Sequence, residues 1–409
     1  MKRILSVIIA ILMIAASVAS FTACNNTGDE VKGMSESPLA IPALSVDFEV
    51  PEDFKIGFIG LHGESSTYDK NFIDAVLRYQ EALGLSNEQV IIKRDVAETE
   101  KCYEAAVDLV SQGCDIIFAN SFGHEPYIAQ AAEEFPDVEF CHATGVTAAS
   151  KGLDNFHNAF ASIYQGRYLA GIAAGLKLNE MIEAGDITAE EAKMGYVGAY
   201  TYAEVISGYT SFYLGAKSVC PTVTMDVQFT GSWYDAPSEK NAAEALIARD
   251  CVLISQHADS MGAPGACEAA GVPNVSYNGS TYEACPDTFI VSSAINWAPY
   301  YMYITKCFAT GTEIATNWCG GIDEGSVVLS GINLDVAAEG TVEAIEKAIA
   351  DLKAGTVHVF NTANFTVGGE TLVHDLVSDG YFHESEDISA PSFSVEIDGI
   401  TLLNREYGE

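Results

Sequence analysis

Two short stretches of this 409-residue chain repeat one pattern: FKIGFIG at residues 54–60 and KMGYVG at residues 193–198. Each is a short apolar run that ends in glycine, which is typical of a buried strand in a parallel sheet. Helical patterns alternate with further strand-like runs after each stretch. Such runs lie at residues 89–92, 115–119, 138–142 and 156–160, and again at 223–230, 252–256, 274–277 and 288–294.

Strand, helix and strand at this spacing indicate right-handed βαβ units on a parallel sheet. Because the pattern restarts, the sequence predicts an α/β fold with two doubly wound, Rossmann-like domains. We expect an N-terminal lobe of residues 52–160 plus 295–320 and a C-terminal lobe of 161–294 plus 321–355. Residues 356–409 are predicted to form a β-rich extension, with a strand–Asp-Gly–strand hairpin at 395–402.

The N-terminus has the features of an export signal. Basic residues at positions 2 and 3 precede an apolar run over 4–19, and small Thr22 and Ala23 precede Cys24. This arrangement resembles a bacterial lipobox, which implies a signal peptide over 1–23 and a lipid on Cys24. We expect a flexible tether over 24–51 and an extracytoplasmic protein anchored to the cell membrane; an uncleaved anchor helix is the alternative.

Charge and cysteine spacing exclude several classes of function. The net charge of −37 disfavours binding to nucleic acid and to anionic lipid. The ten cysteines include no C-x-x-C pair, and the eight histidines do not pair at metal-binding spacing. We therefore predict no metal and no cofactor. The nine cysteines after Cys24 are interpreted as buried thiols, although one or two disulfides, such as Cys267–Cys285, stay open.

Familiar catalytic motifs are absent from the sequence. It contains no G-x-x-x-x-G-K-[ST] phosphate loop, no G-x-S-x-G nucleophile elbow and no H-E-x-x-H zinc motif. We accordingly predict a protein that is not an enzyme and name no catalytic residue. A secreted hydrolase of nucleosides or glycans is the alternative, because catalytic residues assemble in space and not along the chain.

Aromatic and amide side chains follow several predicted strands. Ligands of doubly wound sheets bind beyond the carboxyl ends of the strands, so these side chains are candidates for a ligand site. Flat rings with nearby carboxylates and amides suit a planar heteroaromatic ligand. The candidates are Asp69 and Phe72 after the first strand, Ser121 and Phe122 after the third, and, in the second half, Trp233, Gln256, Asp259, Asn278 and Trp297.

Four motifs in order give a family resemblance: YDKNF at 68–72, GRYLAG at 166–171, MGYVG at 194–198 and GSWYD at 231–235. Together they resemble the basic-membrane-protein (BMP) family of ABC-transporter substrate-binding lipoproteins over roughly residues 52–355. The resemblance implies the type I periplasmic-binding-protein architecture and a purine ligand. It also implies an ABC permease and its ATPase as partners.

The resemblance assigns roles to some of the candidates. Phe72 and Trp233 match the family's base-stacking aromatics, and Asp69 lies in its Asp-Lys-Ser-Phe-Asn-like motif. Ordinary packing is the alternative for both rings, and capping of the following helix is the alternative for Asp69. Asp259 follows a strand without a basic neighbour, which favours a role as acceptor for a ligand N–H.

The predicted ligand is a free purine base, such as adenine, guanine or hypoxanthine. The segments QHADS at 256–260 and NW at 296–297 resemble the branch of the family associated with free bases. Nucleoside binders carry an acidic, glycine-rich turn after the first strand, whereas this chain has LHGES at 61–65. A purine nucleoside, a sugar or another small solute, and a role in sensing instead of transport, are the alternatives.

Overall fold

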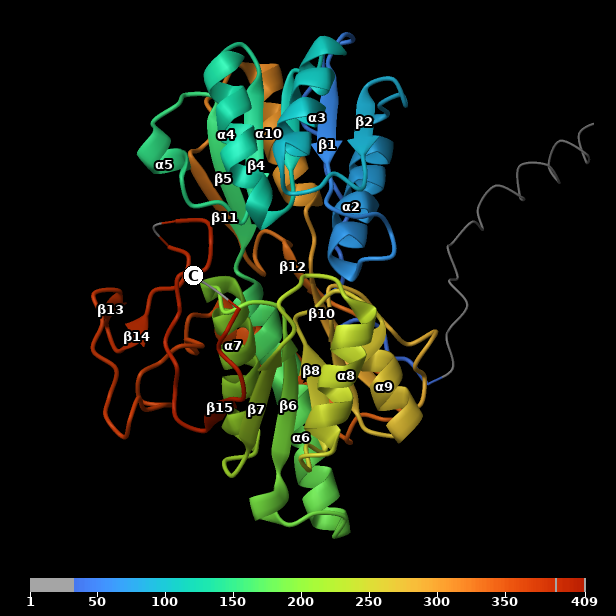
Figure 1. Ribbon diagram of the computed structural model, residues 1–409, viewed down its shortest axis with the longest axis vertical. Helices are drawn as coiled ribbons and strands as arrows, with labels where there is room; N and C mark the ends of the chain where they lie inside the picture. Colours follow the sequence, from blue (N-terminus) through green and yellow to red (C-terminus); the bar gives the residue numbers. More distant parts are fainter. Residues whose placement is uncertain (1–32, 387, 408–409) are drawn as a thin grey trace, which may run out of the picture. The chain divides into compact units, whose positions relative to one another are not determined.

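The computed structural model describes residues 33–386 and 388–407, and Cys24 with the predicted signal peptide lies outside them. The first sheet of the described chain has six parallel strands in the order β11-β5-β4-β3-β1-β2 (Figure 1). Its strands are β1 (Ile56–Ile59), β2 (Val90–Lys93), β3 (Ile116–Ala119), β4 (Glu139–Ala143), β5 (Phe156–Ala161) and β11 (Asn317–Gly320).

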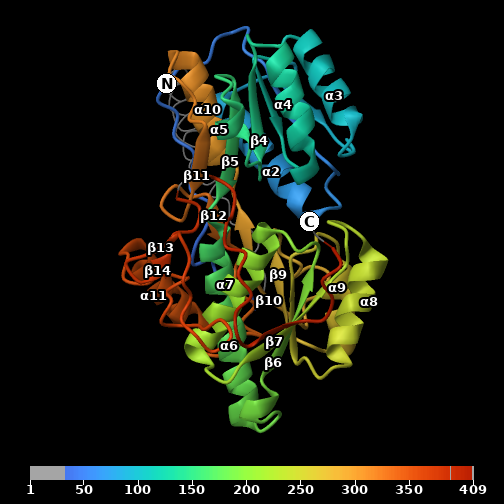
Figure 2. The ribbon, with the colours of Figure 1, turned by 60° about the vertical axis from the view of Figure 1, so that its left-hand side comes forward.

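Helices cover both faces of this sheet, with α10 on one side and α3 and α4 on the other in Figure 2. They bury apolar stripes such as Phe72, Val76 and Tyr79 of α2. The helices are α2 (Thr67–Leu83), α3 (Glu100–Ser111), α4 (Glu125–Glu134), α5 (Ala148–Lys151) and α10 (Ala298–Thr310), with a 3-10 turn η1 (Phe122–His124).

The second sheet, again within the described residues, has seven strands in the order β12-β10-β9-β8-β6-β7-β15. All its pairs are parallel except β10 with β12. The strands are β6 (Lys193–Gly198), β7 (Thr224–Phe229), β8 (Leu253–Gln256), β9 (Asn274–Tyr277), β10 (Phe289–Ile295), β12 (Val327–Leu329) and β15 (Ile400–Leu402). Two doubly wound parallel sheets confirm the predicted α/β fold class.

The helices of the second sheet also lie on both of its faces (Figure 2). They are α6 (Ile163–Ala184), α7 (Ala203–Val219), α8 (Ala236–Ile247), α9 (Gly262–Ala270) and α11 (Thr341–Lys353), with a 3-10 turn η2 (Ala189–Glu191). Helices α6 and α7 approach each other most closely at a glycine. A Cβ on Gly171 of α6 would lie 2.0 Å from the Phe212 carbonyl oxygen of α7. Only a residue without a side chain fits there, so the two helices pack backbone to backbone.

The buried Arg167 ties α6 to the second sheet. Its guanidinium donates to the Ser255 Oγ at 2.9 Å and to the Tyr196 hydroxyl at 3.2 Å, and lies 4.9 Å from the centre of the Tyr277 ring. The described chain passes between the sheets three times: from β5 to α6, from β10 to α10 and from β11 to β12. At these crossings Asn296 accepts from Arg78 at 3.0 Å and donates to the Gly325 carbonyl at 2.9 Å.

The structure differs from the expected flexible tether in the part of it that is described. The Ser35 N–H donates to the Ile332 carbonyl at 2.8 Å, and the Leu329 N–H donates to the Leu39 carbonyl at 2.9 Å. Asp47 pairs with Lys306 at 2.7 Å. Strand-like pairing with the edge near β12 fixes a segment that has no periodicity of its own, so sequence patterning could not reveal it.

The C-terminal extension is mostly irregular, and the predicted hairpin at 395–402 is wrong. Its short strands are β13 (Val377–Ser378), β14 (Tyr381–Phe382) and β15, and β15 pairs in parallel with β7 instead of with 395–398. The carboxylate of Asp398 accepts from the N–H groups of Gly368 and Gly369 at 3.1 and 2.8 Å. These bonds hold Asp398 against the loop at residues 368–369. Residues 395–398 therefore do not fold back on β15.

The nine cysteines of the described residues are all free, and Cys319 alone of these nine is not fully buried. Burial raises the pKa of the Cys114 thiol to about 11 and that of Cys267 to about 12. These thiols therefore stay protonated and behave as small apolar side chains. Within the described residues, no helix combines the length and apolar character that a membrane crossing needs.

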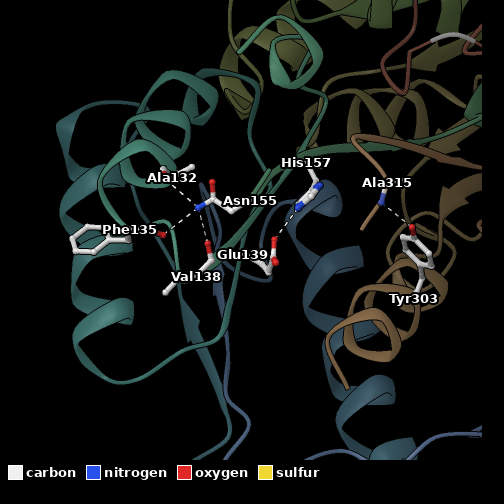
Figure 3. A network of polar contacts seen from close by, with 8 residues as sticks. All are labelled: Ala132, Phe135, Val138, Glu139, Asn155, His157, Tyr303 and Ala315. Atoms are coloured by element: carbon white, nitrogen blue, oxygen red, sulfur yellow. Dashed lines mark hydrogen bonds and ion pairs between the residues drawn. The ribbon is translucent and has the colours of Figure 1, made fainter. Parts of the chain in front are cut away.

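Asn155, just before β5, fixes the end of α4 and the loop that follows it (Figure 3). Its side-chain amide donates to the carbonyls of Ala132, Phe135 and Val138 at 3.1, 3.1 and 2.9 Å. We expect Asn155→Ala to lower the free energy of unfolding by about 1–3 kcal/mol, because buried carbonyls lose their donor. Urea unfolding measures this loss. The exposed Asn87→Ala serves as the control and should change the value by less than about 0.5 kcal/mol; equal effects of the two variants would contradict the assignment.

Candidate ligand-binding site

A cavity lies at the carboxyl ends of both sheets, and the empty space in it, part of which is open to solvent, is about 360 Å³. The first sheet contributes residues that follow β1, β3 and β4, and the second contributes residues that follow β6, β7 and β8. This is the position at which doubly wound sheets bind ligands. The lining residues are Leu61, His62, Tyr68, Asp69, Ser121, Phe122 and Thr144 from the first sheet, and Glu204, Trp233, His257 and Asp259 from the second.

Asp69 is held in place from three directions. Ser66, not Asp69, caps α2: the Ser66 Oγ accepts from the Asp69 N–H at 3.1 Å. The Asp69 Oδ1 accepts from the His62 N–H at 3.0 Å and from the Asn120 side-chain amide at 2.7 Å. The carboxylate is therefore oriented by the loops after β1 and β3, and it lines the cavity.

Aromatic rings form a continuous group along one side of the cavity. Trp233 contacts Tyr200 edge-on, with 4.9 Å between the ring centres, and Tyr200 stacks on Tyr202 with 5.1 Å between the ring centres. Tyr202 in turn stacks on Phe122 at 4.8 Å, so the group spans from the second sheet to the first. Tyr68 lines the cavity from the first sheet, and its hydroxyl donates to the Asn120 carbonyl at 2.7 Å.

Backbone contacts bring the loops of Asp259 and Trp233 together. The Asp259 N–H donates to the Trp233 carbonyl at 3.0 Å. The buried carboxyl of Glu239 accepts from the Asp235 N–H at 2.9 Å and from the Ser260 N–H at 3.1 Å. The Asp259 carbonyl also accepts from the Thr67 N–H at 3.0 Å, at the start of α2. The second-sheet loops are thus fixed to each other and touch the first lobe.

Acidic side chains gather around this point. Burial raises the pKa of the Asp259 carboxyl well above its usual value, and the charges of Asp69, Glu239 and Glu204 add to the rise. The Asp259 carboxyl therefore favours its neutral form and offers both a donor and an acceptor. Glu204 lies 3.5 Å from His257 Nε2, and the His257 Nδ1 lies 3.5 Å from the Tyr196 hydroxyl.

Five predicted site residues line the cavity: Asp69, Ser121, Phe122, Trp233 and Asp259. Ser121 donates from its hydroxyl to Glu98 at 2.6 Å, which fixes the loop after β3. Four of them follow a strand within four residues, and Asp69 lies in the first turn of α2, after β1. The rule that ligands bind beyond the strand ends therefore identified them.

The other four predicted residues do not line this cavity. Phe72 stacks on Trp297 at 4.5 Å, and both rings are buried against the first sheet. Gln256 accepts from Asn274 at 2.9 Å inside the second sheet. Asn278 accepts from Asn71 at 3.0 Å. The expected sandwich between Phe72 and Trp233 is therefore not formed, because Phe72 lies on the apolar stripe of α2 that packs into the core.

Six residues that line the cavity are not among the candidates predicted from the sequence: Leu61, His62, Tyr68, Thr144, Glu204 and His257. Most follow a strand by a few residues, so position alone could have suggested them. Thr144 has a further signal that only the structure shows. It is buried with a φ of 67°, and its hydroxyl has no hydrogen-bond partner among the described residues. Strain and an unsatisfied polar group at one residue often mark a binding site.

Nothing in the described part of the chain groups three or more metal-binding side chains. The cavity offers rings for stacking, and carboxyls with donors and acceptors for a polar edge, which suit the binding of a small ligand. Two doubly wound domains with a cavity between their strand ends define the class of two-lobed solute-binding proteins.

Comparison with known proteins identifies the family. The chain matches the Bmp family, described as ABC transporter substrate-binding protein PnrA-like, over residues 62–359. It is 32% identical over 284 residues to a purine-binding protein of Brucella abortus, covering 68% of this chain and 75% of that protein. The chain therefore belongs to the Bmp family of ABC transporter substrate-binding proteins. The family is one of substrate-binding proteins, which bind a small molecule for a permease.

Two further likenesses are more distant. A Haloferax volcanii protein named as an ABC transporter glucose-binding protein is 31% identical over 249 residues, with 60% of each chain covered. A solute-binding protein of an ABC transporter system from Conexibacter woesei has the same fold, with a TM-score of 0.60 and 20% identity. That alignment covers 75% of this chain and 98% of the other.

Proposed function

We propose that this protein captures a purine base, such as adenine, guanine or hypoxanthine, and presents it to an ABC permease driven by its ATPase. The observation that carries the proposal is the lining of the cavity. Rings of Tyr68, Phe122 and Trp233 lie together with the carboxyls of Asp69 and Asp259. Rings stack on the faces of a planar base, and carboxyls bind its N–H groups.

The same geometry supports a capture mechanism in which the ligand holds the two lobes closed. Asp69 and Tyr68 belong to the first lobe, whereas Trp233 and Asp259 belong to the second. A ligand that contacts both sets stabilises the closed arrangement and shifts the population toward it. We take the lobes as residues 52–160 plus 295–320 and residues 161–294 plus 321–355, with the three crossings as the hinge.

The turn after β1 favours a base over a nucleoside. Residues 61–65 read LHGES, where nucleoside binders of the family carry an acidic, glycine-rich turn. A sugar is the second candidate, because of the likeness to the Haloferax protein named for glucose binding.

We further propose that the protein is a lipoprotein held outside the cytoplasmic membrane by a lipid on Cys24. The basic start, the apolar run over residues 4–19 and the small residues before Cys24 support this. Mass spectrometry of the membrane-extracted protein tests it. A mature chain that starts at Cys24 with a diacylglyceryl group supports the anchor, and an unmodified Cys24 contradicts it.

Identification of the molecule that co-purifies with the protein tests the ligand class. The protein is expressed in its full length, purified without added ligand and denatured, and the released small molecules are identified by mass spectrometry. We expect a purine base in near-stoichiometric amount. A hexose in its place would support the second candidate and overturn the purine proposal.

A further inference from the structure

The C-terminal segment 400–407 lies outside the family match, which ends at residue 359. It begins with β15, which lies beside β7 at the edge of the second sheet (Figure 1). Ile400, Thr401 and Leu402 pair with residues 225–227 of β7. The segment thus gives β7 a second neighbour and runs in the same direction, toward the strand ends that form the cavity.

Asn404 continues this pairing to the last residue of β7. Its Oδ1 accepts from the Phe229 N–H at 2.8 Å, and its Nδ2 donates to the Phe229 carbonyl at 3.0 Å. The side-chain amide therefore satisfies both backbone groups of Phe229, as a neighbouring strand would. Trp233 follows only four residues later.

Tyr407 then contacts both loops that carry the aromatic group of the cavity. Its carbonyl accepts from the Thr201 N–H at 2.7 Å, and Thr201 stands between Tyr200 and Tyr202. Its ring covers Gly231, two residues before Trp233: a Cβ on Gly231 would lie 2.6 Å from the ring. Gly231 has a φ of 74°, so both its conformation and this contact require glycine.

We propose that residues 400–407 are a positioning element for the ligand site. The segment does not line the cavity. It acts through the loops at 199–203 and 230–235, which it holds so that Tyr200, Tyr202 and Trp233 stay in contact. Asn404 and Tyr407 are the positioning residues. The inference rests on the proposed function for its effect on affinity, but the effect on the loops is independent of the ligand.

Hydrogen exchange of the ligand-free protein tests the positioning role. In Tyr407→Ala, which removes the ring from Gly231 but keeps the backbone carbonyl that accepts from Thr201, the backbone amides of 230–235 should exchange at least fivefold faster than in the wild type. Amides of β1 and β3 in the first sheet should be unchanged, which shows that the fold is intact. Asn404→Ala is the second variant and should accelerate exchange in 230–235. Tyr407→Phe keeps the ring on Gly231 and should restore the wild-type rates.

The matched control is Arg405→Ala, since Arg405 is exposed and pairs with the exposed Glu396. It should leave exchange in both loops unchanged. Wild-type exchange of residues 230–235 in Tyr407→Ala would overturn the inference, as would equal acceleration throughout both sheets. Binding is measured in parallel with adenine, guanine and hypoxanthine, and Tyr407→Ala should raise the Kd at least fivefold. A wild-type protein that binds none of the three overturns the proposed function, whereas the exchange result still decides the positioning role.

Discussion

Trp233→Ala should raise the Kd for the purine by about 30- to 1,000-fold, which corresponds to about 2–4 kcal/mol. The indole lines the cavity and contacts Tyr200 edge-on at 4.9 Å. Its removal takes away a stacking surface for the base and the support of the neighbouring rings. Because Trp233 is only half-buried, the melting temperature of the ligand-free variant should stay close to that of the wild type.

Trp318→Ala is the matched control for this prediction. Trp318 is also half-buried, but its ring packs against Tyr300 at 5.0 Å in the first lobe and does not line the cavity. Calorimetry should give a nearly unchanged Kd for it. A large fall in melting temperature for Trp233→Ala, with unchanged affinity, would show that the indole is a core residue and not a ligand contact.

Asp259→Asn should weaken binding and stabilise the ligand-free protein at neutral pH. The amide of the variant keeps one acceptor oxygen, but it places an NH₂ group, which only donates, where the carboxyl has its second oxygen; a ligand N–H that faces this group is left unpaired. This costs about 1–3 kcal/mol, or about a 5- to 150-fold rise in Kd. The gain in stability follows from the raised pKa of Asp259 in the folded state.

The raised pKa of Asp259 sets the sign of the pH dependence of stability. The unfolded chain releases the Asp259 proton near pH 4, whereas the folded protein retains it to a higher pH. Asp259 therefore lowers the free energy of unfolding progressively as the pH rises above about 4. Urea unfolding at pH 4 and pH 7 should show a larger advantage of Asp259→Asn at pH 7. Equal differences at both pH values would contradict the buried, neutral carboxyl.

The sheets could be predicted from sequence because buried parallel strands have a strong local signature. Runs such as residues 54–60 and 193–198 are apolar on both faces and are followed by helical periodicity. Asp69, Trp233 and Asp259 could be predicted for a related reason: parallel strands place whatever follows them at one edge of the sheet.

Other features depend on packing that the sequence does not encode locally. Phe72 and Trp297 are far apart in the chain, and only the fold shows that their rings stack on each other at 4.5 Å. The pairing of β15 with β7 joins residues about 175 positions apart, so an Asp-Gly turn near it suggested a local hairpin instead. The Asp259 pKa likewise depends on Asp69 and Glu204, which approach it only in the folded chain.

Isothermal titration of ligand-stripped protein with adenine, guanine, hypoxanthine, inosine and glucose tests the central claim most directly. A planar base held by rings and carboxyls from both lobes predicts micromolar or tighter binding of at least one free base, with inosine weaker and glucose without effect. Flat traces for all three bases, or tight binding of glucose alone, would contradict it.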